Sequence, residues 1–218
     1  MEIVEVDLRE AELEDLLVFV FSHRPTGKAR GSKEWYWKKD YRLRVDPTRQ
    51  VVLMTQLFRR SAKLLRTYSE TQIEDGFWFL IGPAGSDWFR DQLWNRRVAW
   101  HARRNCIASI PHLYTGVFRA PLGTMSQMLW DLLTEDYRFG KRIPKGNRDA
   151  RRVQLAMLRA LEVQLKLPHR EAQTAALHGL GHIGMPEART CIRKFLSRKR
   201  LPRSLVSYAE QALTGKLL

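Results

Sequence analysis

The 218-residue chain carries a formal charge of +15 and contains 44% hydrophobic and 10% aromatic residues. This composition excludes a disordered polypeptide, and the length allows a sizeable core. No apolar run reaches the roughly 18 residues of a membrane span, and two distant cysteines exclude a disulfide framework. Because the acidic start also differs from a signal peptide, we expect a cytoplasmic globular protein.

The charge is unevenly distributed along the sequence. Residues 138–218 hold 18 Lys and Arg against 5 Asp and Glu, whereas residues 1–137 hold 20 against 18. Residues 1–22 are acidic, with seven acids and one arginine. An excess of one sign attracts surfaces of the opposite sign, so this asymmetry bears on the choice of partner.

The N-terminal segment is expected to be helical. Asp7 and Glu10 have the spacing of a capping box, and apolar residues then recur at helical spacing, which predicts a first helix over 7–22. A basic loop is expected over 23–34. Residues 41–45 carry the only convincing strand signal in the sequence.

Helix start signals recur through the middle of the chain. Asp46-Pro47 places a capping residue before a proline in the first turn, and Ser69-x-x-Gln72 is a second capping box. Gly82-Pro83 is expected to end the helix that Ser69 begins. Further helices are expected from residue 88, over 96–110 and over 125–133.

The helical pattern becomes more regular near the C-terminus. Helices are expected over 149–167 and 170–184, then from Pro186 and from Pro202, with Gly215 ending the last one. Residues 141–148 are expected to link an N-terminal helical region, 1–140, to this basic region, 149–218, within one continuous domain. We expect an all-α fold of about eight to ten helices in antiparallel hairpins, as in an α-solenoid.

One stretch carries a family resemblance. Residues 175–196, A-A-L-H-G-L-G-H-I-G-M-P-E-A-R-T-C-I-R-K-F-L, resemble a HEAT repeat of the short bacterial type. In such repeats an Ala-, Leu- and Gly-rich helix is followed by G-x-P-E-A and a second amphipathic helix. Blocks such as W-F-L-I-G-P-A-G-S-D and N-C-I-A-S-I are loosely similar to a bacterial family of uncharacterised function. These resemblances imply a helical-repeat fold and no particular activity.

His178 and His182 are candidate metal ligands because residues four apart project from one helix face. A zinc site needs a third ligand, and the sequence offers only His169 and Glu171 nearby. The glycines between and beside the two histidines favour another interpretation, in which small residues allow a neighbouring helix to approach closely. We therefore expect helix packing here, and neither a metal nor a cofactor.

The basic C-terminal region is the strongest candidate binding surface. Its excess of positive charge is larger than solubility requires, and equivalent helices of a solenoid line one surface. The alternative is an ordinary solvated face of a basic protein. The candidate binding residues are Arg148, Arg151, Arg152, Arg159, Arg189, Arg193, Arg198, Lys199, Arg200 and Arg203.

Aromatic and acidic residues supply two further candidates. Trp35 and Trp37 lie in W-Y-W-K-K, which combines aromatic rings with Lys38 and Lys39 as in a platform on which nucleic-acid bases stack. Large aromatic side chains more often anchor a loop to the core. Asp87 and Asp131 each lie beside a tryptophan, and helical-repeat glycosylases that remove alkylated DNA bases use aromatic residues and a catalytic Asp, although neither pair matches a motif of that family. The chain has no recognisable nucleotide-binding or nucleophile motif.

The sequence therefore predicts a non-enzymatic helical scaffold. It would bind an acidic macromolecule through the basic C-terminal surface, with a protein as the expected partner, for example in an adaptor or a toxin-neutralising protein. Nucleic-acid binding is the first alternative, and an alkyl-base DNA glycosylase is the second.

Overall fold

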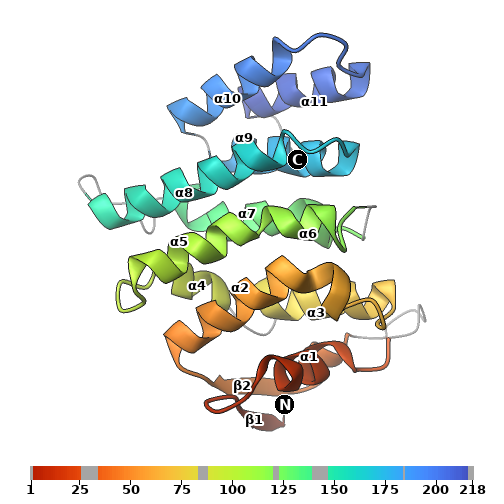
Figure 1. The fold of residues 1–218 in the computed structure, drawn as a ribbon, viewed down its shortest axis with the longest axis vertical. Coiled ribbons are helices and arrows are strands. Elements are labelled where there is room, and N and C mark those ends of the chain that lie inside the picture. Colours follow the sequence, from red (N-terminus) through yellow and green to blue (C-terminus); the bar gives the residue numbers. More distant parts are fainter. Residues whose placement is uncertain are drawn as a thin grey trace. The chain divides into compact units, whose positions relative to one another are not determined.

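The protein is mostly helical, with one small sheet among the residues described (Figure 1). The computed structural model describes residues 2–25, 34–82, 88–119, 123–138, 147–183 and 185–215. Two compact units are distinguished, residues 1–106 and 107–218, and each is described by itself. The expected linker, 141–148, falls mostly outside the described residues. Within these residues, no helix combines the length and apolar character needed to cross a membrane.

The first unit contains a parallel pair of strands, and the sequence predicted only the second of them. Strand β1 (Ile3–Asp7) pairs with β2 (Asp40–Arg44) along its whole length. The second strand confirms the signal at 41–45, but the expected helix start at Asp7 is wrong. Helix α1 (Leu13–Phe21) begins six residues later, where Glu12 and Asp15 form the capping box.

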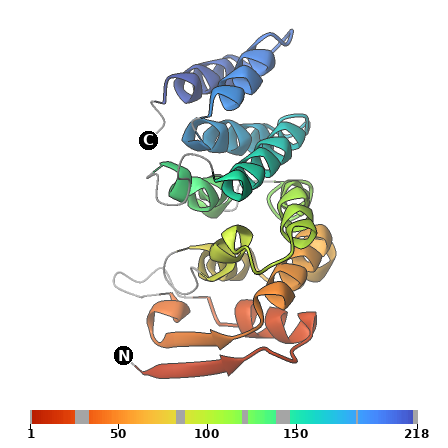
Figure 2. The same ribbon diagram turned by 90° about the vertical axis from the view of Figure 1, so that its left-hand side faces the viewer.

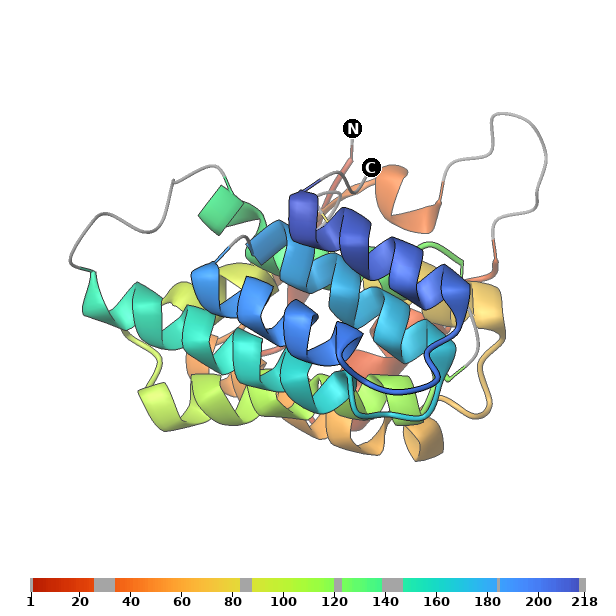
Figure 3. The ribbon, with the colours of Figure 1, turned by 90° about the horizontal axis from the view of Figure 1, so that it is seen from above.

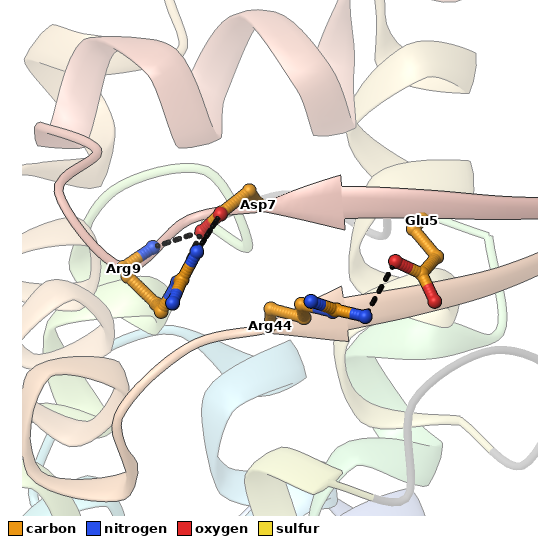
Figure 4. A network of polar contacts seen from close by, with 4 residues as sticks. All are labelled: Glu5, Asp7, Arg9 and Arg44. Carbon is orange, nitrogen blue, oxygen red and sulfur yellow. Dashed lines mark hydrogen bonds and ion pairs between the residues drawn. The ribbon is translucent and has the colours of Figure 1, made fainter.

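Asp7 has a different role from the predicted helix cap. Its carboxylate accepts hydrogen bonds from the backbone N–H and the Nε–H of Arg9, at 3.1 and 3.0 Å, and Arg44 of β2 reaches Glu5 of β1 at 2.7 Å (Figure 4). The hydrogen bonds from the Arg9 side chain are the main reason why the pKa of Asp7 falls to about 2. The carboxylate therefore fixes the turn after β1.

The second and third helices of the first unit begin where the capping signals predict. Asp46 accepts hydrogen bonds from the N–H groups of Thr48 and Arg49 at 2.8 and 3.0 Å, and Ser69 and Gln72 form the second capping box. These caps satisfy N–H groups that have no partner inside the helix. The elements that follow β1 and α1 are the 3₁₀ turn η1 (Trp35–Trp37), β2, α2 (Pro47–Leu64), α3 (Glu70–Ile81) and α4 (Trp88–Trp94), with α5 (Trp100–Ser109) crossing the unit boundary.

The second unit consists of two packed rows of helices (Figures 2 and 3). Helix α9 (Arg170–Ile183) packs against α7 (Met125–Arg138) on one side and α11 (Arg203–Thr214) on the other. In the second row, α8 (Arg148–Gln164) packs against α6 (Pro111–Thr115) and α10 (Pro186–Leu196). Consecutive helices α8 and α9, and likewise α10 and α11, pack on each other across the rows. Gly215 ends α11 in the left-handed conformation, at φ 69°, as expected.

Gly179 lies at a close contact in the centre of this unit. A Cβ atom built on Gly179 would lie 2.6 Å from Cβ of Trp130 on α7 and 2.9 Å from Cδ2 of Leu161 on α8. Both distances are too short for a side chain, so a glycine is needed where α9 meets its two neighbours. The packing interpretation is confirmed for Gly179, whereas Gly184 lies outside the described residues.

Candidate functional site

Four polar side chains form a continuous line across the row α7–α9–α11. On α9, the rings of His178 and His182 lie side by side, with 4.4 Å between their centroids. His182 Nδ1 lies 3.0 Å from Oδ1 of Asp131 on α7, and His178 Nδ1 lies 2.8 Å from the hydroxyl of Tyr208 on α11. We call Asp131, His182, His178 and Tyr208 the polar chain.

The local sequence explains how the polar chain is positioned. His178 and His182 are one helical turn apart, so both project from the same face of α9. Asp131 follows Trp130, whose side chain packs against Gly179, and this contact brings α7 close enough for Asp131 to reach His182. Trp130 is itself fixed because its Nε1–H donates a 2.8 Å hydrogen bond to Oε1 of Gln164.

Burial keeps His178 uncharged at neutral pH. His178 is only 4% exposed, and burial, followed by the neighbouring His182, lowers its pKa to about 4. Burial also raises the pKa of Tyr208, so the hydroxyl remains protonated. Nε2 of His178 is buried and has no hydrogen-bond partner within the described part of the chain. Such a group in a folded protein calls for an explanation, such as an ion or an ordered water.

Asp131, His178 and His182 have the composition of a transition-metal site. Each residue offers a ligand atom, and these atoms lie within 4.8 Å of one another. The structure thus brings together a candidate catalytic residue, Asp131, and the candidate metal ligands His178 and His182. The sequence did not indicate this grouping, since Asp131 is far from the histidines along the chain and nothing singled out Tyr208.

Most of the basic residues predicted to bind a partner lie on the second unit's other row. We call this group the basic face. Arg148, Arg151, Arg152 and Arg159 belong to α8, Arg189 and Arg193 to α10, Arg198, Lys199 and Arg200 to the turn after it, and Arg203 to the start of α11. All are exposed except Arg151, which is half-buried and pairs with Glu187 of α10. Since α8 and α10 share a row (Figure 3), most of these charges come from one layer of the unit.

A small pocket of about 100 Å³ lies between α8 and α10, next to Arg198. Leu165 and Phe195 give it an apolar floor, and Arg198 holds its guanidinium 4.9 Å above the Phe195 ring while donating a 2.9 Å hydrogen bond to the Leu165 carbonyl. Lys166 and Lys194, which our sequence reasoning left out, add two cations to the lining. Glu162 and Cys191 complete it, with the Cys191 thiol donating to the Glu162 carboxylate at 3.0 Å.

The remaining candidates lie outside both features. Trp35 is only 6% exposed and stacks on His23, with 3.7 Å between ring centroids, so one ring face is already occupied inside the first unit. Trp37 is 44% exposed. Asp87 lies outside the described residues.

Comparison of the chain with protein-family models, with curated proteins and with solved structures gives no match.

Proposed function

We propose that this protein is a non-enzymatic, HEAT-like helical scaffold that binds an acidic protein through the basic face. The observation that carries the proposal is the placement of the exposed cations, which lie mainly on α8, on α10 and in the turn after α10. Cations fixed on a helical surface attract an acidic partner over a long range and set the register in which it binds. The HEAT-like interpretation is supported by the successive helix pairs of the second unit, which pack row upon row.

Two observations favour a protein partner over a nucleic acid. The pocket beside Arg198 combines an apolar floor with a cationic rim, which suits an acidic peptide with an apolar anchor. Glu162 and Glu187 lie among the cations, and Glu187 pairs with Arg151. A mixed pattern of charges is suited to a protein surface of complementary pattern, whereas a phosphate backbone favours uninterrupted positive charge.

The test compares labelled acidic peptides with a DNA duplex by fluorescence anisotropy at about 50 mM and about 200 mM salt. We expect the full chain to bind a Glu-rich peptide containing one leucine, and to bind the same peptide without leucine more weakly. Reversing Arg189, Arg193, Arg200 and Arg203 to Glu should weaken binding by about tenfold or more.

The matched control reverses four exposed cations of the first unit, Arg59, Arg60, Lys63 and Arg66. This control carries the same change in net charge, so retained peptide binding would attribute the effect to the basic face. Binding of DNA but not of peptide would replace the proposal with the nucleic-acid alternative. If both variants lose the same amount of peptide affinity, the effect depends only on net charge, and the proposal is overturned.

A further inference from the structure

We propose that Asp131, His178 and His182 bind a divalent transition-metal ion of the zinc class. The ligands would be one carboxylate oxygen and one ring nitrogen from each histidine, a donor set that zinc accepts in proteins. They come from the neighbouring helices α7 and α9, and Tyr208 of α11 supports His178 from behind. The ion would therefore link α7 and α9 directly, and α11 would be linked through the hydrogen bond between His178 and Tyr208.

The separations between the ligand atoms are compatible with an ion after small side-chain rotations. Bonds of about 2.0–2.1 Å in a tetrahedral arrangement place neighbouring ligand atoms about 3.3 Å apart. Oδ1 of Asp131 and Nδ1 of His182 are already 3.0 Å apart, and the three ligand atoms together lie within 4.8 Å. The contraction that remains is about 1.5 Å at most.

The hydrogen bond to Tyr208 prepares His178 as a ligand. When Nδ1–H of His178 donates to the Tyr208 hydroxyl, Nε2 carries the free lone pair, and Nε2 is the buried atom that lacks a partner. A metal-bound histidine usually donates its other ring N–H to a neighbouring acceptor in this way. A metal on Nε2 therefore accounts for a polar atom that the surrounding described residues leave unsatisfied.

The environment of the three ligands leaves a route by which an ion could enter. The Asp131 side chain is 22% exposed, which provides a route from solvent, and the His182 side chain is 8% exposed. Three protein ligands leave one position of a tetrahedral ion for water.

The experiment measures Zn²⁺ binding to the full chain, after chelator treatment, by competition with a chromophoric chelator. We expect one ion per chain. Co²⁺ in the same site should show the visible absorption bands of a tetrahedral nitrogen and oxygen environment. Asp131→Asn and His178→Gln should each weaken Zn²⁺ binding by more than tenfold. Tyr208→Phe, which keeps the ring but removes the partner of Nδ1, should weaken it by about 10–100-fold.

Two controls keep the result interpretable. His101→Gln, which changes an exposed histidine of α5, should leave the affinity unchanged. Far-UV circular dichroism shows whether each variant is folded, and Asp131→Asn preserves shape at a partly exposed position should His178→Gln fail to fold. The proposal is overturned if the chain binds no stoichiometric Zn²⁺, or if folded Asp131→Asn and Tyr208→Phe bind it as well as the parent. In that case an ordered water is the remaining partner for Nε2 of His178.

Discussion

Replacing Gly179 with alanine tests the packing of the second unit most directly. The added methyl carbon would lie 2.6 Å from Cβ of Trp130, which is rigidly attached to the α7 backbone, and 2.9 Å from Leu161. Overpacking of this kind costs about 1–3 kcal/mol, and a contact to a backbone-proximal atom belongs at the upper end. Alanine returns about 1 kcal/mol in helix propensity. We therefore expect Gly179→Ala to lower the free energy of unfolding by about 2 kcal/mol.

Thermal unfolding followed by circular dichroism and by tryptophan fluorescence measures this loss. For a chain of this size, about 2 kcal/mol corresponds to a fall in Tm of about 4–8 °C. Shortening Leu161 to valine removes one of the two clashing atoms, so the double variant should lose less stability than the sum of the two single variants. A stabilised Gly179→Ala protein, or strictly additive losses, would refute the close approach of the three helices.

Three further predictions address a helix cap, a buried histidine and a strained turn. Asp46→Ala removes the acceptor for two N–H groups of α2 and should cost about 1 kcal/mol in chemical denaturation. In the metal-free protein, His178 binds a proton in the unfolded state between about pH 6.5 and about pH 4, whereas the folded state does not bind it. The free energy of unfolding should therefore fall as the pH drops through this window. His178→Gln should make this pH dependence less steep. Arg200 has a φ of 64°, a conformation that glycine adopts more easily than arginine. Arg200→Gly should therefore raise the free energy of unfolding by up to about 1 kcal/mol, measured as a slightly higher Tm, and should weaken peptide binding.

Local sequence signals predicted the elements whose causes are local. The starts of α2 and α3 and the end of α11 depend on caps within a few residues, and all three occur where expected. Strand β1 escaped prediction because its partner β2 is far along the chain, while Asp7 and Glu10 imitate a capping box. The Asp7 carboxylate instead accepts hydrogen bonds from Arg9, two residues along the chain, so helical spacing alone was misleading.

The polar chain was missed for the same physical reason. His178 and His182 were recognisable as a pair because a helix places residues four apart on one face. Their partners come from other helices, and only packing decides which side chains of α7 and α11 reach them. A search for a third ligand near the histidines in sequence therefore found His169 and Glu171, whereas the structure supplies Asp131.

The two proposed sites lie mainly on different rows of the same unit, and Arg203 is the member of the basic face that shares α11 with the polar chain. The histidines of α9 contact side chains of α7 and α11, so they face along their own row and not toward α8 and α10. Most cations of the basic face project from α8 and α10. Charge reversal on the basic face should therefore leave Zn²⁺ affinity unchanged, and loss of Zn²⁺ in Asp131→Asn should leave peptide affinity unchanged while lowering stability. Coupling between the two would instead mean that α9, which contacts both rows, shifts when the ion binds.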